Sequence, residues 1–419
     1  MASGKSVLVI GGGVIGLCTA YYAMKAGHKV TVLEREAREH DGCSFGNAGM
    51  VVPSHFIPLA APGMVGLGLR MLLRPDGPFY LRPRLDADLL HWVLSFMRAA
   101  NAGHVARSAP LLRDLNLASR ACYEALADES GNEFGLVKKG LLMLCRSESA
   151  LHHEARVAAQ AKALNVPAQV VSPEEAARLD PAVRMDIAGG VYFPHDCHLN
   201  PGHFVSRLTE RLEREGVGFL WSTEVWDWTA APDGISAVST NHGSLSADEY
   251  VVAGGAWSSV LMRRLGLRLP LQAGKGYSIT LPAPRELPAL CSIFTEARVA
   301  VTPMGDSLRF AGTMEITGLD TSINRRRVGG ILKSIPAYMP AFKSEDFRGL
   351  PVWTGLRPCS PDGMPYIGRP KGLNNLCIAT GHAMMGMSLG PITGKLVAEL
   401  LSDREPSLDI GLLRPNRYA

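Results

Sequence analysis

The 419-residue sequence lacks the features that mark disulfide-stabilised, zinc-binding or membrane-spanning proteins. Its eight cysteines form no Cys-x-x-Cys pair and follow no regular spacing, which argues against a disulfide framework and against a metal site. It has no uninterrupted apolar run of about 18 residues, so we predict no transmembrane helix. Scattered cysteines are typical of reduced thiols, and we therefore expect a cytoplasmic protein.

Neither sign of charge is in large excess. Lys and Arg total 43 against 39 Asp and Glu, and the basic residues are dispersed, which argues against nucleic acid as a partner. The apolar content of 47% is ordinary for a globular enzyme. Because 419 residues exceed the usual single hydrophobic core, two domains are expected.

The N-terminus contains a complete dinucleotide-binding pattern. Ser6–Ile10 is a short aliphatic run suited to a buried parallel strand, and Gly11, Gly13 and Gly16 follow it in GxGxxG spacing. These glycines allow a tight turn, close approach to a pyrophosphate and close packing of the next helix. Glu34 is the acid expected to bind the ribose, about 20 residues after the glycines.

Glycine-rich strand ends recur later in the chain. Tyr250–Ala253 is an aliphatic strand that ends at Gly254, and Leu376–Ala379 leads into Gly381–Gly394. We predict the last helix from about Pro391 to Leu401. Between these segments, short β-rich runs predict an antiparallel sheet.

The predicted fold is therefore a discontinuous α/β Rossmann-like cofactor domain combined with an α+β substrate domain that contains an antiparallel sheet. We assign residues 1–80, 190–270 and 352–419 to the cofactor domain and residues 81–189 and 271–351 to the substrate domain.

Several motifs connect the chain with a known family. They are Ser44-Phe-Gly-Asn-Ala-Gly49, Lys275-Gly-Tyr-Ser278, Gly355-Leu-Arg-Pro358 with Pro361-Asp-Gly363, and Gly381-His382 to Gly394. With the opening glycines, they resemble the FAD-dependent D-amino-acid oxidase superfamily, closest to the bacterial D-amino-acid dehydrogenases (small-subunit type), along nearly the whole chain. The resemblance implies noncovalent FAD, hydride transfer to flavin from an amine next to a carboxylate, and an electron acceptor such as a quinone.

The resemblance also implies a set of cofactor-binding residues besides the three glycines and Glu34. They are Val14, Ile15, Arg35, Ser44, Asn47, Gly49, Val225, Gly254, Gly386, Ser388, Leu389 and Gly390. Turn chemistry alone also explains the residue types at 44–49. The positive end of the last helix would stabilise negative charge on a reduced flavin.

Five residues are candidates for the substrate side of the site. Arg357 is the leading candidate to face the substrate carboxylate or the flavin edge, because a planar guanidinium matches a carboxylate bidentately. Arg309 is the second candidate to bind the carboxylate. Tyr277 either hydrogen-bonds the carboxylate or packs in a core. His382 either contacts flavin or substrate or caps a turn, and His55 is the weakest candidate.

Two other functions remain open at this point. One is an oxidase of the same superfamily, acting on glycine, sarcosine or a D-amino acid and passing electrons to oxygen. The other is a flavoprotein that acts on a macromolecule such as modified tRNA. A cyclic substrate such as D-proline or hydroxyproline would also suit the dehydrogenase.

The apolar stretch Phe56–Leu73 has two interpretations. It forms either a loop and short helix that cover the active site, or a membrane-surface patch flanked by arginines. The second interpretation would make the protein peripheral on the inner face of the membrane.

Overall fold

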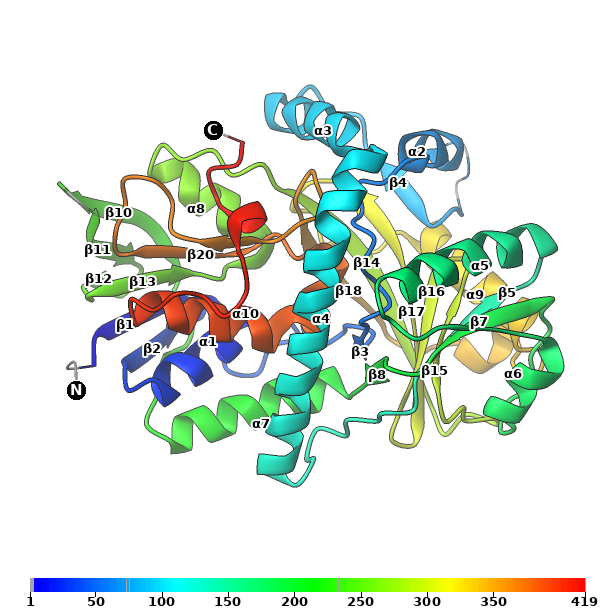
Figure 1. The fold of residues 1–419 in the computed structure, drawn as a ribbon. Helices are drawn as coiled ribbons and strands as arrows, with labels where there is room; N and C mark the ends of the chain where they lie inside the picture. Colours follow the sequence, from blue (N-terminus) through cyan, green and yellow to red (C-terminus); the bar gives the residue numbers. More distant parts are fainter. Residues whose placement is uncertain (1–3, 73, 75, 233, 419) are drawn as a thin grey trace.

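The computed structural model describes residues 4–72, 74, 76–232 and 234–418. Two large sheets lie side by side, and the long helix α4 (Ala102–Ser130) runs past both of them (Figure 1). This arrangement confirms the predicted fold class, a Rossmann-like part combined with an α+β part. The residue ranges assigned to the two domains stay a prediction.

The first sheet has six strands, of which all but β19 run parallel to their neighbours. In spatial order they are β19 (Tyr366–Gly368), β20 (Leu376–Thr380), β13 (Glu249–Val252), β1 (Ser6–Ile10), β2 (Lys29–Leu33) and β9 (Gly218–Leu220). Strands from the start, middle and end of the chain are thus hydrogen-bonded neighbours. Long-range pairing of this kind makes the Rossmann-like part discontinuous in sequence.

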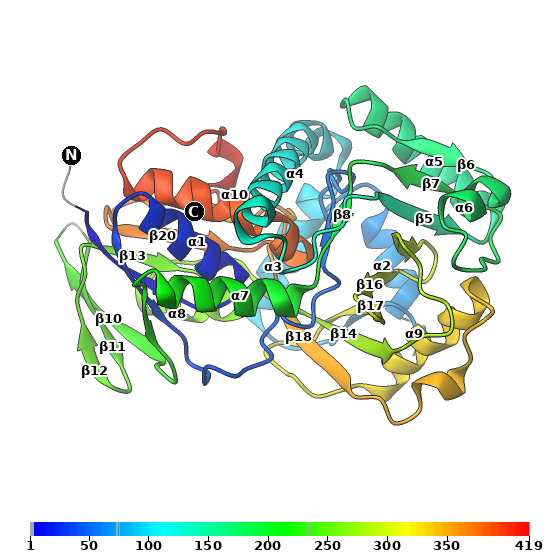
Figure 2. The same ribbon diagram turned by 90° about the horizontal axis from the view of Figure 1, so that it is seen from below.

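Alternate residues of β1 point to opposite faces of this sheet. Val7 and Val9 pack against α1 (Val14–Lys25), α7 (Pro201–Arg214) and α10 (Gly386–Leu401). Leu8 and Ile10 pack against α8 (Ser258–Arg264) and a three-stranded sheet (Figure 2). The strands of that sheet are β10 (Val225–Ala231), β11 (Gly234–Thr240) and β12 (Gly243–Leu245). Both faces are therefore buried, as parallel sheets require.

The second sheet has nine strands and is largely antiparallel. In order they are β18 (Val352–Cys359), β14 (Gln272–Pro282), β17 (Ser307–Ile316), β16 (Val299–Met304), β15 (Cys291–Phe294), β5 (Leu141–Cys145), β7 (Gly189–Phe193) and β6 (Gln169–Val171), with β4 (Phe79–Leu81) paired to β17. A two-stranded ladder joins β3 (Met50–Val51) to β8 (Cys197–His198). The remaining helices are α2 (Met64–Leu72), α3 (Ala87–Ala99), α5 (Glu148–Ala163), α6 (Pro173–Leu179) and α9 (Arg325–Tyr338).

We call the two faces of the nine-stranded sheet inner and outer. The outer face, with Ile279 and Phe310, packs on Ile331 and Ile335 of α9. The inner face carries Met143, which lies in the same hydrophobic cluster as α1 and α10. Side chains on the inner face therefore point toward the Rossmann-like part.

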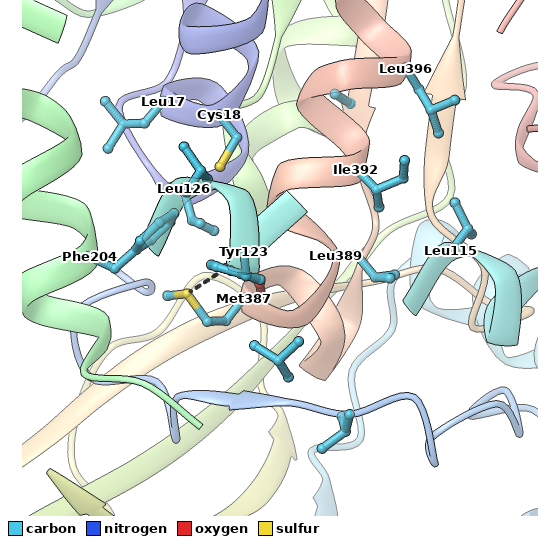
Figure 3. Close-up of a cluster of buried hydrophobic side chains, with 14 of the residues drawn as sticks. Leu17, Cys18, Leu115, Tyr123, Leu126, Phe204, Met387, Leu389, Ile392 and Leu396 are labelled. Carbon is cyan, nitrogen blue, oxygen red and sulfur yellow. Dashed lines mark hydrogen bonds between the residues drawn. The ribbon is translucent and has the colours of Figure 1, made fainter. Parts of the chain in front are cut away.

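Helices α1, α4, α7 and α10 share one core around Tyr123, Phe204 and Met387 (Figure 3). Close packing of α10 on α1 depends on small residues. A Cβ at Gly394 would lie 2.4 Å from the carbonyl carbon of Cys18, so a side chain there has no room.

The last helix begins at Gly386, so the predicted start near Pro391 was wrong. Proline has no backbone N–H, and inside a helix it leaves the carbonyl four residues earlier without a donor. Here that carbonyl belongs to Met387, and the Tyr123 hydroxyl donates to it at 2.5 Å. A hydrogen bond from a side chain of α4 thus replaces the one that Pro391 cannot make, and the helix therefore extends back to Gly386. Pro110 likewise lies inside a helix, α4, which starts at Ala102.

Candidate active site

The turn between β1 and α1 is built as a pyrophosphate site requires. Gly11 has a φ of 115°, and a Cβ there would lie 2.5 Å from the Ala253 carbonyl oxygen. Gly13 precedes α1 without a side-chain cap, and no acidic residue stands in the first helical turn. The nearest atom to a Cβ at Gly13 would be the Ser44 hydroxyl oxygen at 3.4 Å. The helix amides and the positive helix end can therefore receive an anion.

Glu34 lies against this turn at the end of β2. Its carboxylate accepts hydrogen bonds from the Gly12 amide at 2.6 Å and the Glu36 amide at 3.0 Å. The Ser44 hydroxyl accepts from the Val14 amide at 3.0 Å. Groups that are distant in the sequence are thus fixed around the glycines, where we expect the ribose and pyrophosphate of a dinucleotide to bind.

The carboxyl end of β13 closes the other side. A Cβ at Gly255, whose φ is 55°, would meet no atom within 4 Å, and one at Gly254 only ordinary contacts. The Arg35 guanidinium lies 3.7 Å from the ring centre of Trp257. Val225 is buried at the start of β10. Open glycine backbone, the positive end of α1 and a positioned carboxylate are a donor and acceptor set that fits FAD.

The predicted residues of α10 divide into two groups. The Ser388 hydroxyl donates to Asn116 at 2.7 Å and accepts from the Val52 amide at 3.0 Å, and Leu389 is buried in the core. A Cβ at Gly390 would lie 2.9 Å from Val14, so this glycine serves helix packing. A Cβ at Gly386 would make only an ordinary contact, 3.8 Å from the Cβ of His382. We therefore expect the backbone of the first turn to be the part of α10 that contacts a flavin.

Arg357 lies on the inner face, beside strand β14. A Cβ at Gly276 would lie 2.2 Å from its guanidinium, which donates to the Thr313 carbonyl at 2.8 Å. Burial lowers the pKa of Arg357. Within the described part of the chain, no carboxylate lies within salt-bridge distance of it. A partly buried cation without a counterion favours an anionic ligand.

Arg309 also lies on the inner face, and its Nε and Nη1 donors are used within the protein. It donates to Thr280 at 3.0 Å and to the main-chain carbonyls of Phe45 and Asn47 at 2.9 and 2.8 Å. Burial lowers its pKa to about 10. The structure thus brings Arg309 to the 44–49 loop. That loop is shaped by Asn47, which accepts from the Gly49 amide.

Tyr277 lies on the outer face and is not brought to Arg357. It belongs to the cluster under α9, its hydroxyl donates to Glu315 at 2.6 Å, and it accepts from the Asn324 amide at 3.0 Å. Burial and the Glu315 hydrogen bond raise its pKa. Its surroundings match the core-packing alternative. Successive residues of a strand point to opposite faces, so Tyr277 points away from the face that carries Arg357.

His382 is buried between β20 and α10. Its Nε2 contacts the Thr393 hydroxyl at 2.9 Å, while Nδ1 has no partner in residues 4–418 as described. Burial lowers its pKa to about 3, so the ring is neutral. Its backbone pairs with Cys359, which places it at the end of the strand that carries Arg357.

Sequence reasoning overlooked two polar residues next to His55. The Ser54 hydroxyl lies 3.0 Å from His55 Nδ1 and donates to the carboxylate of Asp196, which has no exposed surface. The only sequence signal was an acid in the turn that follows the strand ending at Phe193. Trp353 was also overlooked, and it covers Gly46 and Gly355, where a Cβ would meet its ring.

Comparison with known proteins agrees with this geometry. The family model described as FAD dependent oxidoreductase matches residues 6–400, and the chain belongs to that family. The cofactor of the family is FAD.

Among its relatives, the chain is similar to proteins named D-amino acid dehydrogenase. A D-amino acid dehydrogenase of Methylobacterium radiotolerans is 35% identical, and one of Granulibacter bethesdensis 33%, each over 99% of both chains. Among solved structures, glycine oxidase from Geobacillus kaustophilus has a TM-score of 0.80 at 24% identity and full coverage of both chains. L-proline dehydrogenase from P. horikoshii has a TM-score of 0.73 at 20% identity, covering 100% of this chain and 98% of the other. These likenesses show the fold.

Proposed function

We propose that the protein is a D-amino-acid dehydrogenase with noncovalently bound FAD. The observation that carries the proposal is the Arg357 guanidinium, a partly buried cation on the sheet face toward the predicted flavin site. It has no carboxylate partner among the described residues. The names of the relatives at 33–35% identity support a D-amino acid as the substrate.

Each element has a distinct task in this proposal. FAD supplies the acceptor for the hydride that leaves the substrate α-carbon. Arg357 binds the α-carboxylate and so fixes the orientation of the α-carbon. Arg309 holds the 44–49 loop at the cofactor through its bonds to Phe45 and Asn47. The first turn of α10 offers its positive end to the developing negative charge.

Anaerobic bleaching of the flavin tests the proposal directly. The purified holoenzyme is mixed with D-alanine, D-proline, glycine, sarcosine and the L-enantiomers. We expect reduction by D-amino acids and slow reoxidation in air compared with a quinone analogue. Bleaching by none of these compounds would exclude amino-acid oxidation, and fast reoxidation in air would assign the protein to the oxidases.

The arginine assignment has its own test. Arg357→Ala should retain FAD but reduce the apparent affinity for the amino acid by about 100-fold, since a charge-assisted bidentate contact is lost. Arg357→Lys should recover only part of it, because an ammonium does not match the carboxylate fork. Unchanged reduction kinetics in Arg357→Ala would contradict the proposed site.

We also propose that helices α2 and α3 contact a membrane surface from which a quinone could be reached. Leu90, Leu94 and Met97 form an exposed stripe on α3, and Leu69 is exposed on α2, at the same edge of the molecule (Figure 1). Exposed arginines accompany these side chains: Arg70, Arg74, Arg82 and Arg98. An apolar face with flanking cations is suited to anionic lipid. No helix in the described ranges is long and apolar enough to span a membrane, and Leu73 lies outside them.

Vesicle sedimentation tests this surface. The holoenzyme should sediment with phosphatidylglycerol vesicles and much less with phosphatidylcholine vesicles. Leu90→Asp combined with Leu94→Asp should weaken sedimentation about tenfold, because both apolar area and charge complementarity are lost. Leu412→Asp, at an exposed leucine elsewhere in the chain, is the matched control. Equal sedimentation of all variants would contradict the assignment.

A further inference from the structure

A continuous hydrogen-bonded chain joins Asp196, Ser54 and His55. The function proposed above gives no role to this chain. The Ser54 amide donates to one Asp196 oxygen at 3.1 Å, and its hydroxyl donates to the other. The same hydroxyl oxygen lies 3.0 Å from His55 Nδ1. Asp196 and Ser54 are buried, whereas His55 is only partly buried. His55 Nε2 has no hydrogen-bond partner among the residues described.

The segment that carries this chain passes between the two halves of the proposed site. The Val52 amide donates to Ser388 in the first turn of α10. Further along, Leu59 packs with Cys359 and Met314 of the nine-stranded sheet. Residues 53–58 therefore lie between the helix end offered to the flavin and the strand that carries Arg357. For His55 to reach it, the nitrogen of an amino acid whose carboxylate binds Arg357 would have to lie beside this segment.

Counting protons fixes the direction of the hydrogen bonds. A serine hydroxyl has one proton, and when Asp196 is ionised that proton is donated to the carboxylate. Ser54 then accepts from His55 Nδ1–H, so that His55 Nε2 carries a lone pair. If Asp196 is protonated, it donates to Ser54, Ser54 donates to Nδ1, and Nε2 carries the proton instead. The charge of Asp196 thus selects the histidine tautomer.

On the basis of the function proposed above, we propose that this chain relays a proton from the substrate ammonium group to Asp196. The ammonium proton bonds to His55 Nε2, the Nδ1 proton moves to Ser54, and the Ser54 proton moves to Asp196. The substrate nitrogen regains the lone pair that hydride loss from the α-carbon requires. One proton leaves the substrate and Asp196 gains one, and His55 is neutral before and after the transfer.

The electrostatic surroundings agree with a relay in which His55 passes the proton on and Asp196 keeps it. Burial lowers the pKa of His55 to about 4, with a further contribution from Arg298, so His55 alone is a weak base. Burial raises the pKa of Asp196 to about 7, against the hydrogen bonds of Ser54 and the charge of Arg120. The thiols of Cys197 and Cys291 also face Asp196, and their own pKa values are raised, so they stay neutral. Asp196 is therefore the group that can store the proton near neutral pH.

Stopped-flow flavin reduction across the pH range tests the relay, with the fastest-reducing amino acid of the panel at saturation. In the wild type the rate constant should rise with pH and level off above an inflection near pH 7. In Asp196→Asn the inflection should disappear and the plateau rate should fall about 100-fold, with KM almost unchanged. A purely structural role would change folding or KM but would leave the inflection in place.

Two further variants keep the test decisive if Asp196→Asn folds poorly. Ser54→Ala breaks the chain and should lose the inflection, while Ser54→Thr retains a hydroxyl and should restore it. Asp128→Asn, at an exposed carboxylate of α4, should behave as the wild type. An inflection that survives in both Asp196→Asn and Ser54→Ala overturns the relay. Absence of bleaching in the wild type would instead overturn the proposed function.

Discussion

The guanidinium of Arg357 occupies the space where a side chain at Gly276 would stand, since a Cβ there would lie 2.2 Å from its Nη2 atom. The two residues belong to hydrogen-bonded neighbours, β18 and β14. The glycine therefore does more than permit a strand: it leaves room for a cation on the inner face. Two motifs that looked independent in the sequence, Lys275–Ser278 and Gly355–Pro358, meet in this one contact.

Replacement of Gly276 by alanine should displace Arg357 without removing it. We expect the apparent affinity for the amino acid to fall about tenfold, because the guanidinium can no longer reach its position beside Thr313. FAD content should be unchanged. Titration of flavin bleaching measures the effect. Gly329→Ala in α9, where a Cβ meets no atom within 4 Å, is the control. Equal effects of the two substitutions would contradict this account.

Removal of the Arg309 side chain should weaken FAD binding more than substrate binding. Its bonds to the Phe45 and Asn47 carbonyls are lost in Arg309→Ala, which frees the 44–49 loop. At about 1–2 kcal/mol for such charge-assisted bonds, FAD should dissociate roughly ten times more readily. Fluorescence of released flavin measures this. If FAD affinity were unchanged while the amino-acid KM rose, Arg309 would take over the carboxylate role.

Replacement of Gly394 by alanine should destabilise the protein. The new methyl group would lie 2.4 Å from the Cys18 carbonyl carbon, and both helices would have to move apart. Overpacking of this kind costs about 1–3 kcal/mol in the free energy of unfolding. Urea denaturation of the holoenzyme measures it. Gly66→Ala, in α2 with open space around it, should be neutral or slightly stabilising, and a similar loss there would argue against the packing explanation.

The titration of Asp196 should appear in stability as well as in activity. Its pKa is raised to about 7 in the folded state, while an unfolded aspartate titrates at about 3.9. Between those values the folded state binds more protons, so wild-type stability should fall as pH rises, by up to roughly 1.4 kcal/mol per pH unit. Above pH 7 this contribution should level off.

Asp196→Asn lacks that titration, so its stability relative to the wild type should improve from about pH 5 to about pH 7. Thermal or urea unfolding at several pH values measures the difference. Asp128→Asn, at an exposed site, should show no pH-dependent difference. A constant offset between wild type and Asp196→Asn at all pH values would mean that the carboxyl has an ordinary pKa.

Local chemistry explains which parts of the molecule could be predicted. Gly11 and Gly16 must be glycine because a Cβ would lie 2.5 and 1.9 Å, respectively, from a backbone carbonyl oxygen. This requirement is visible in the sequence as a spacing. The start of α10 was misjudged for a nonlocal reason. Pro391 is tolerated because Tyr123, far away in the sequence, donates to the Met387 carbonyl.

By itself, the sequence determined the Rossmann-like architecture, the glycine turn with Glu34, and the family with its FAD. These depend on spacings within one βαβ unit or one motif, where covalent connection fixes what lies near what. Only the tertiary structure decided which face of the second sheet each candidate occupies. It placed Arg357 toward the Rossmann-like part, assigned Arg309 to a loop and turned Tyr277 outward. It also joined Ser54 to Asp196 across 142 residues, because strand pairing and burial act between segments that no local pattern connects.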